Sequence, residues 1–198
     1  IKPLIGTEMY MSPRSMEEKQ GKMAKEYAHL ILLAKDITGY RNLCVLSTLG
    51  FTKGKYYRPR IDYAALEAHK DGLIAMSACL SGDLPRMLMA DRYDDALAYV
   101  KRMKDMFGED YYIELQNHGI EDELRTLPKL LKICEETGVK PVATNDVHYV
   151  AKGDAEAQDV LLCIQTGKFL SEPNRMKMEG SEFYLKPVEE MEKLFAVC

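Results

Sequence analysis

Residues 72–79 read GLIAMSAC, a brief apolar run that ends in small and polar residues. Such a run is typical of a strand buried on both faces, as the strands of parallel sheets usually are. Similar runs recur along the chain and alternate with segments of helical periodicity, which predicts α/β architecture with mainly parallel strands. The expected strands are Leu4–Met11, Leu30–Ala34, Leu73–Ser77, Tyr111–Leu115 and Pro141–Thr144.

Helices are predicted where apolar residues recur at steps of three or four. Gly108, Gly138 and Gly167 follow three of these segments, in the position of a C-terminal stop. Residues 171–183 contain proline, asparagine and glycine and are expected to form an excursion or loop. The expected helices include Tyr40–Ser47, Tyr93–Lys104, Ile120–Cys134 and Ala157–Ile164, and a last one runs from Pro187 through Phe195.

The composition is that of a globular protein, with 198 residues, 46% of them hydrophobic and 29% charged. This excludes disorder and small disulfide scaffolds. The net charge of -4 provides no overall basic field for nucleic acid, so a nucleic-acid role would need a local site. The sequence begins at Ile1 without a methionine and stops at Cys198 inside an expected helix. We therefore expect a single domain over residues 1–198, cut from a longer protein.

The cysteines indicate a reducing compartment, because their number is odd and none forms a C-x-x-C pair. No apolar run is long enough for a membrane span, and no signal peptide is recognisable, so we expect a cytoplasmic protein without a membrane partner. The cysteines are Cys44, Cys79, Cys134, Cys163 and Cys198.

Polar residues that follow the expected strands are candidates for a site, because the C-terminal ends of parallel strands share one rim. They are Glu8, Cys79, the Asn117-His118 pair, Asp146 and His148. The strongest signal is Asp146-Val147-His148, since an extended Asp-x-His places both side chains on one side, where they can share a metal ion. Each residue also has a structural interpretation: a solvated strand end for Glu8, a surface turn or a satisfied hydrogen-bonding pair for Asp-x-His, packing for Cys79, and a capping or loop role for His118.

Other chemistry is less well supported. The chain has no glycine-rich phosphate loop and no G-x-S-x-G motif. Residues 53–60, KGKYYRPR, combine cations with aromatic rings in an expected loop and could contact phosphates and stack on bases, although a structural use of these tyrosines is the simpler interpretation. The methionines are expected to fill the core.

Five segments together resemble the PHP (polymerase and histidinol phosphatase) domain of bacterial DNA polymerase III alpha subunits. The resemblance extends over essentially the whole chain and implies a (β/α)7-type barrel, distorted and similar to a TIM barrel, with a metal site on one rim. The family's opening His-x-His motif, an acidic residue and an Asp-His pair precede the position of Ile1, so the barrel is expected to be incomplete, without its N-terminal strands. The segments are HLILLAK (29–35), YYRPRID (56–62), GLIAMSAC (72–79), ATNDVHY (143–149) and DVLLCIQTG (159–167).

The resemblance implies five metal ligands in this chain, namely Glu8, His29, Cys79, Asp146 and His148. His29 precedes an apolar run and would otherwise be interpreted as a buried histidine. Imidazole and thiolate suit zinc, while the carboxylates also allow manganese or magnesium. His118 matches none of the family's ligands and keeps its structural interpretation.

The implied parent protein is a DNA-directed DNA polymerase in which this domain supports metal-dependent 3'-5' exonuclease proofreading, with Asp146 and His148 as catalytic residues. DNA, other replicase subunits, a proofreading exonuclease subunit and the sliding clamp are the implied partners. The alternative is a non-catalytic scaffold that stabilises the polymerase or docks the exonuclease subunit. A free-standing phosphoesterase fits less well, because the resemblance extends beyond the ligands. The isolated 198 residues are expected to have little or no activity.

Overall fold

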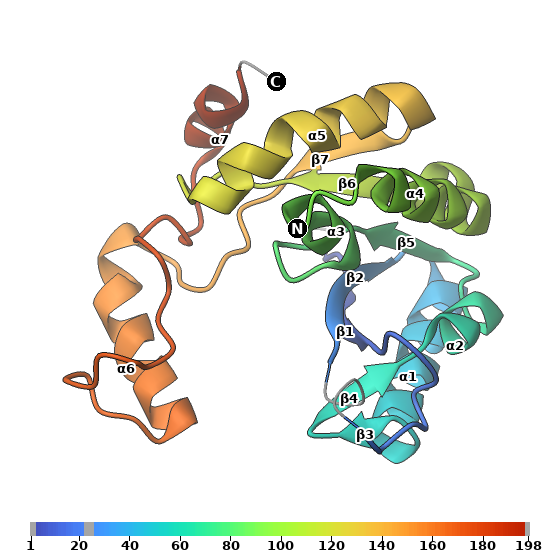
Figure 1. Cartoon of the computed structure of the whole chain (residues 1–198), viewed down its shortest axis with the longest axis horizontal. Coiled ribbons are helices and arrows are strands. Elements are labelled where there is room, and N and C mark those ends of the chain that lie inside the picture. The colour runs from blue at the N-terminus through green and yellow to red at the C-terminus, as the bar shows by residue number, and fades with distance from the viewer. Residues whose placement is uncertain (1–2, 22–25, 197–198) are drawn as a thin grey trace. The chain divides into compact units, whose positions relative to one another are not determined.

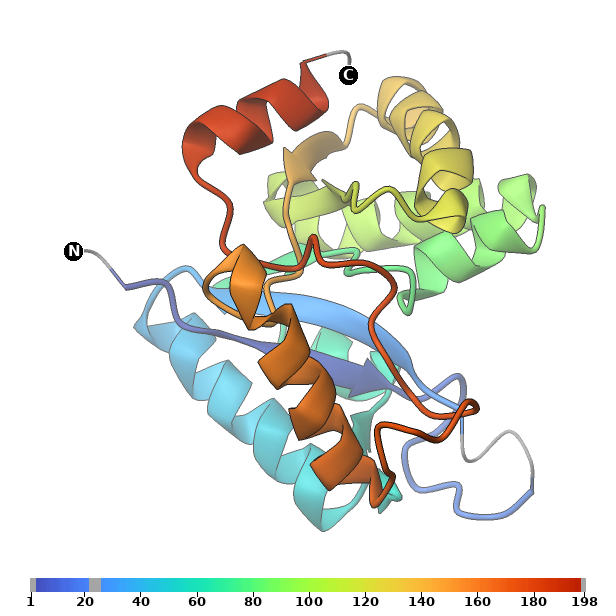
Figure 2. The same cartoon turned by 90° about the vertical axis from the view of Figure 1, so that its left-hand side faces the viewer.

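The computed structural model describes residues 3–21 and 26–196, so that Ile1 and Cys198 lie outside the described residues. The chain forms two compact units, which are described separately below. The first unit comprises residues up to Glu114 together with Lys129–Val142, and the second comprises Leu115–Pro128 together with the residues from Ala143 onward. The elements of both units are labelled in Figure 1 and shown from a second direction in Figure 2.

Strands and helices are interspersed along the described chain, which confirms the predicted α/β class, although β1-β2, β3-β4 and α3-α4 follow one another without strict alternation. The strands pair in the order β3-β4-β1-β2-β5-β6-β7. Their bounds are β1 Gly6–Met11, β2 Ala28–Ala34, β3 Lys55–Tyr56, β4 Arg58–Ile61, β5 Leu73–Met76, β6 Tyr111–Leu115 and β7 Lys140–Ala143.

The expectation of mainly parallel strands is wrong for the centre of the sheet. β2 runs antiparallel to both β1 and β5, whereas the β1-β4 and β5-β6 pairs are parallel. A parallel connection needs a crossover, usually a helix, while an antiparallel pair does not. The described parts of the β1-β2 connection, residues 12–21 and 26–27, contain no helix, in keeping with the antiparallel pairing.

All the predicted helices are confirmed, and two short ones were not predicted. Gly108 and Gly167 end α4 and α6 at positive φ, as their positions in the sequence indicated. The two additional helices, α2 and α3, have 6 and 7 residues, too few to show a period. Among the described residues, no helix has the length and apolar character needed to span a bilayer. The bounds are α1 Ile37–Thr52, α2 Tyr63–Ala68, α3 Asp83–Met89, α4 Tyr93–Phe107, α5 Glu121–Thr137, α6 Ala155–Thr166 and α7 Val188–Phe195.

The core of the first unit lies between the sheet and α1, which packs against β1, β2 and β4 (Figure 2). Leu30 and Leu32 of β2 are buried, as is Leu46 of α1. At the start of α1, a Cβ atom on Gly39 would lie 1.8 Å from the carbonyl oxygen of Gly72. Only glycine therefore allows the helix to approach the chain this closely.

Residues 53–60 do not form the expected loop, because they contain the paired strands β3 and β4. Tyr57 makes the turn between them with a φ of 60°. Arg60 is fully buried, and its guanidinium donates hydrogen bonds to the carbonyl oxygens of Gly54 (3.3 Å) and Glu18 (3.0 Å). This cation therefore holds the hairpin to the loop that follows β1, since buried donors require acceptors.

The second unit contains α6, α7 and a long segment between them. Residues 171–183 contain neither helix nor strand, which confirms the predicted excursion. Arg175 in this segment forms a two-pronged ion pair with Asp159 of α6, in which Nη2 donates to Oδ2 at 2.6 Å. A bidentate pair of this kind fixes orientation as well as distance, so it ties the excursion to α6.

Candidate metal centre

Three of the predicted ligands meet on the first unit. The Nδ1 atom of His29 on β2 lies 2.8 Å from Oε1 of Glu8 on β1. The sulfur of Cys79, which follows β5, lies 3.8 Å from the same nitrogen. The pairing of β2 with both β1 and β5 brings these positions together, although they are far apart in the sequence. Carboxylate, imidazole and thiol therefore converge on one ring nitrogen.

The turn that carries Cys79 has a constrained backbone. Ala78 has a φ of 62°, which is unusual for a residue with a side chain. Its amide donates a 2.6 Å hydrogen bond to Oε2 of Glu114, and the amide of Glu114 donates to the hydroxyl of Ser77 at 2.9 Å. Backbone strain of this kind persists where the surroundings over-determine it, and it concentrates at functional sites. Glu114 thus holds the turn that presents Cys79.

The imidazole of His29 has an anionic environment. Burial by itself would favour the neutral ring, but hydrogen bonds and charges from Cys79 and Glu8 outweigh it and raise the pKa of His29 to about 9. An environment that stabilises an imidazolium also favours other cations at the same place.

The chemistry of these three donors fits a metal ion. Zinc binds carboxylate oxygen, imidazole nitrogen and cysteine sulfur, and the cluster offers one of each. In the described parts of the chain, however, no group of three or more His, Cys, Asp and Glu side chains is arranged to hold an ion, and the donors of this cluster contact one another instead. The cluster matches zinc in donor type.

The other two predicted ligands, Asp146 and His148, belong to the second unit. Asp146 has a φ of 39°, so this predicted ligand itself lies at a strained backbone position, whereas at Cys79 the strain is in the preceding residue, Ala78. The Nδ1 atom of His148 lies 2.6 Å from the carbonyl oxygen of Asp146. A carbonyl only accepts, so Nδ1 carries the proton, and the lone pair of Nε2 on this exposed ring is left for a ligand. Metal-binding histidines typically have this arrangement.

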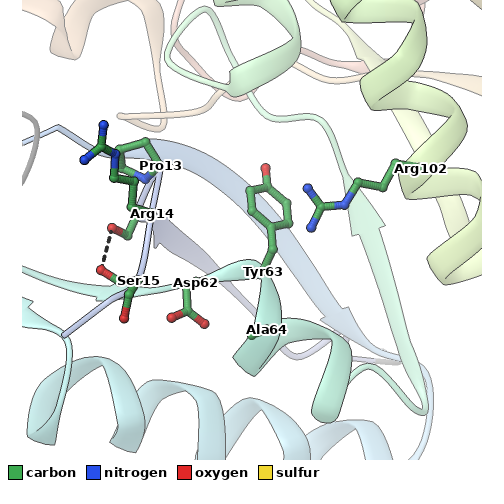
Figure 3. A pocket seen from close by; sticks show the side chains of 8 residues that line it. Pro13, Arg14, Ser15, Asp62, Tyr63, Ala64 and Arg102 are labelled. Atoms are coloured by element: carbon green, nitrogen blue, oxygen red, sulfur yellow. Dashed lines mark hydrogen bonds between the residues drawn. The ribbon is translucent and has the colours of Figure 1, made fainter. Parts of the chain in front are cut away.

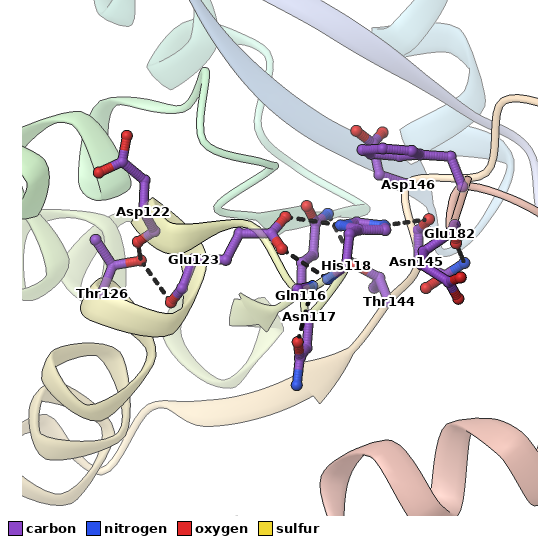
Figure 4. A network of polar contacts seen from close by, with 12 residues as sticks. Gln116, Asn117, His118, Asp122, Glu123, Thr126, Thr144, Asn145, Asp146 and Glu182 are labelled. Atoms are coloured by element: carbon purple, nitrogen blue, oxygen red, sulfur yellow. Dashed lines mark hydrogen bonds and ion pairs between the residues drawn. The ribbon is translucent and has the colours of Figure 1, made fainter. Parts of the chain in front are cut away.

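Asn145 fixes the backbone that carries this pair. Its side-chain amide donates to the carbonyl oxygens of Glu182 at 2.8 Å and Tyr184 at 2.7 Å. Its own carbonyl accepts a 3.0 Å hydrogen bond from Nε2 of His118 (Figure 4). The amide of His148 donates to the carbonyl of Phe183 at 2.8 Å. The excursion 171–183 and the residues just after it therefore support the Asp146-His148 segment.

His118 is buried between two acceptors, as Figure 4 shows. Its Nδ1 lies 2.7 Å from Oε1 of Glu123, and its backbone amide donates to Oε2 of the same carboxylate, also at 2.7 Å. The His118 side chain is 0% exposed and that of Glu123 5%. The ring stacks on Phe183 at a centroid distance of 4.0 Å. Both ring nitrogens are thus engaged, in agreement with the structural interpretation of His118.

The geometry of His118 also indicates its charge. Because a carboxylate and a carbonyl both accept, a ring protonated on both nitrogens satisfies both partners. Burial opposes this charge, but the hydrogen bonds to Glu123 and to the carbonyl of Asn145 outweigh it and raise the pKa of His118. His118 and Glu123 therefore form a buried ion pair that supports the segment carrying Asp146 and His148.

Glu114, Glu123 and Asn145 were missed in the sequence, yet they hold the candidate ligands. The sequence did contain a signal for Glu114, which is a carboxylate inside the apolar run Tyr111–Leu115. A charged residue in such a run is expected to be buried and therefore to have a partner, as Glu114 does. Asn145 directly precedes the Asp-x-His pair but was not singled out. Glu123 is in the first turn of an amphipathic helix, where acidic residues are common, so nothing distinguished it.

A separate cavity of about 430 Å³ lies in the first unit. Its walls come from residues 12–15, from the start of α2, and from Arg102 of α4, whose guanidinium lies 4.4 Å from the ring centroid of Tyr63 (Figure 3). None of the five predicted ligands lines it. The candidate metal ligands and this cavity are therefore different features of the molecule.

Comparison with known proteins identifies the family. The family model of the PHP domain matches residues 1–118. The DNA polymerase III subunit alpha of Borreliella burgdorferi is 48% identical over 98% of this chain, that of Treponema pallidum is 45% identical over 98%, and that of Deinococcus radiodurans is 43% identical over 100%. The chain spans only 17%, 17% and 15% of the length of these relatives. From the family match and the α/β fold we conclude that the chain belongs to the PHP domain family.

Proposed function

We propose that this chain is the PHP module of a replicative DNA polymerase alpha subunit, whose parent protein carries out template-directed nucleotide transfer. The support is the similarity to DNA polymerase III alpha subunits along nearly the whole chain. The proposed partners are DNA and other replicase subunits, including a proofreading exonuclease subunit and the sliding clamp, and the proposed location is the cytoplasm. The proposed architecture is an incomplete (β/α)7-type barrel.

Glu8, His29, Cys79, Asp146 and His148 are the proposed metal ligands. The observation that carries this proposal is the meeting of Glu8, His29 and Cys79 at one imidazole nitrogen. The tautomer of His148 supports the proposal, because Nδ1 carries the proton and the unprotonated Nε2 can bind a metal ion. Zinc is the proposed metal, and manganese and magnesium are alternatives. Bound divalent ions would supply an activated water and a clamp for the oxygens of a phosphodiester.

The proposed activity is 3'-5' hydrolysis of DNA, with Asp146 and His148 as catalytic residues. His148 is held by two hydrogen bonds, from its ring to the carbonyl of Asp146 and from its amide to the carbonyl of Phe183. A ligand held this way needs little reorganisation before it binds. The turn that carries Cys79 is likewise held in place, by the hydrogen bonds of Glu114 with Ser77 and Ala78.

The test uses full-length protein, freed of metal and reloaded with zinc or manganese, and a DNA strand labelled near its 3' end. Asp146→Ala and His148→Ala should each lower the rate of 3'-end hydrolysis by at least a hundredfold, as losses of ligands or catalytic groups typically do. The matched controls are Asp105→Ala on the exposed face of α4 and His69→Ala at the end of α2. Unchanged hydrolysis in both site variants would refute the catalytic role.

A non-catalytic scaffold is the alternative, and two observations favour it. Among the described residues, the His, Cys, Asp and Glu side chains are not arranged around an ion. The net charge of -4 also gives little attraction for the phosphates of DNA. A scaffold with a vestigial site would hold no stoichiometric metal. Metal analysis of the purified full-length protein separates the two functions, because the catalytic one requires bound metal that Cys79→Ser reduces.

A further inference from the structure

One face of the sheet carries a tyrosine and an arginine together with two of the proposed ligands. Side chains alternate along a strand, so Glu8 and Tyr10 of β1 lie on the same face. Tyr10 is paired directly with His29 of β2 and with Arg60 of β4, and paired residues share a face. Arg58 precedes Arg60 by two positions and therefore lies on this face as well.

Two aromatic rings adjoin the His29 imidazole on this face. The ring of Tyr10 lies 5.3 Å from that of His29 and 4.7 Å from that of Tyr27, in an edge-to-face arrangement with the latter. Tyr27 is nearly parallel to His29, at 6.0 Å and 8°. Both tyrosines are only partly buried, so an additional planar group can reach them.

Arg58 adds a cation to these rings. Its guanidinium carbon lies 5.9 Å from the ring centroid of Tyr10, and its side chain is exposed. Nowhere in residues 3–21 and 26–196 does a carboxylate form an ion pair with it. The buried Arg60 anchors the same strand through backbone carbonyls, so the backbone that carries Arg58 is held in place.

Cations beside exposed aromatic rings are how proteins bind single-stranded nucleic acid, because the rings stack on unpaired bases and the cations hold the phosphates. We infer that Tyr10, Tyr27 and Arg58 bind the 3'-terminal nucleotides of a single DNA strand. Arg58 contacts a backbone phosphate, and the tyrosines stack on a base. This inference rests on the proposed hydrolytic function, since it places the end of the strand beside Glu8 and His29.

The charge of the whole chain does not oppose this placement. A net charge of -4 excludes a broad basic surface, but one arginine and two tyrosines form a local site for a flexible end. Duplex DNA fits less well, because its bases are already stacked on one another and cannot pack on the tyrosines.

The test measures hydrolysis of a single-stranded oligonucleotide by full-length, metal-loaded protein across a range of salt concentrations. Arg58→Ala should raise KM about tenfold, with kcat within about twofold, and should lower the slope of log affinity against log salt by about 1. Arg41→Ala, which removes an exposed arginine of α1, is the matched control and should leave KM unchanged.

Tyr10 is tested by two substitutions that separate the ring from the hydroxyl. Tyr10→Phe should keep KM for the oligonucleotide near that of the natural protein, whereas Tyr10→Leu should raise it about fivefold or more, since stacking a base on a ring contributes about 1–3 kcal/mol. Equal KM values for Phe and Leu would contradict stacking.

Hydrolysis of bis(4-nitrophenyl) phosphate separates failure of the inference from failure of the proposed function. This small diester needs the metal chemistry but offers no strand to bind. If the natural protein hydrolyses both substrates and Arg58→Ala matches Arg41→Ala on the oligonucleotide, the inference is overturned while the proposed function stands. If the natural protein hydrolyses neither substrate with any of the three metals, the proposed function fails and the inference fails with it.

Discussion

Three of the four histidines differ in role because of the atoms around them. His29 faces a carboxylate and a thiol, His118 faces a carboxylate and a carbonyl, and His148 faces one carbonyl with its other nitrogen open. The buried pair of His118 and Glu123 is structural, since both ring nitrogens are engaged. The open ring of His148 has the arrangement that metal-binding histidines typically have. Residue type alone separates none of these roles.

The His118–Glu123 pair should make local stability depend on pH. The folded-state pKa of His118 is raised above the unfolded value of about 6.5. The stability that the protonated ring contributes is therefore fully present below about pH 6.5, and it is lost as the pH rises through the folded-state pKa. Glu123 of α5 and Asp146 are the acidic groups that face the ring. Hydrogen-exchange protection factors for residues 118–149 of the full-length protein should therefore fall as pH rises above about 6.5.

His118→Gln is the comparison for this effect. It removes the titrating group, so the decline in protection with pH should become flatter. Glu123→Ala leaves the buried imidazolium without its partner and should cost about 3–5 kcal/mol, measured as lost protection in the same residues. A decline that is equally steep with and without the imidazole would contradict the proposed charge of His118.

Cys79 is the thiol whose replacement tests the metal ligands. Cys79→Ser exchanges a soft thiolate for a hydroxyl that zinc binds poorly, so zinc content measured by mass spectrometry should fall by at least tenfold. Cys44→Ser changes an exposed cysteine of α1 and is the matched control. Equal zinc contents in the two variants would exclude Cys79 as a ligand.

At the scale of elements, periodicity located the helices but not the direction of the strands. α4, α5 and α6 lie where their apolar spacing and C-terminal glycines indicated. β2 is antiparallel to its neighbours because strand direction depends on the connections, which a short apolar run does not report. The hairpin of β3 and β4 was not predicted because its strands have only 2 and 4 residues and carry mainly cations and a proline, without an apolar pattern.

The turn that carries Cys79 depends on a glycine. A Cβ atom on Gly82 would lie 2.2 Å from the carbonyl oxygen of Ser77, which is backbone and cannot move aside freely. Gly82→Ala should therefore destabilise this turn by about 1–3 kcal/mol, as overpacking does. The expected readouts are a lower melting temperature and faster hydrogen exchange in residues 77–90.

Gly153→Ala provides the control for this substitution. A Cβ atom there would meet no heavy atom within 4 Å, so the melting temperature should stay the same or rise slightly, because alanine restricts the unfolded chain. If Gly82→Ala and Gly153→Ala change the melting temperature by the same amount, the close contact of Gly82 with the Ser77 carbonyl does not require a glycine in this turn.

At the scale of the whole molecule, metal binding and folding should be linked. A ligand that binds only the folded state stabilises it by about 2.7 kcal/mol when its concentration is a hundred times Kd. Adding zinc to metal-free full-length protein should therefore slow hydrogen exchange around Cys79 in the first unit and around Asp146 and His148 in the second. The Cys79→Ser variant should show a smaller change, and no change in the natural protein would speak against bound zinc.

The sequence by itself determined the α/β class, the main helices and the types of the candidate ligands, because apolar spacing and residue chemistry are local properties. Only the tertiary structure determined the direction of β2, the meeting of Glu8, His29 and Cys79, and the support from Glu114 and Asn145. The physical reason is that hydrogen bonds and ion pairs between distant residues form only when folding brings them together. Local periodicity reports which residues are buried but not which partners they have.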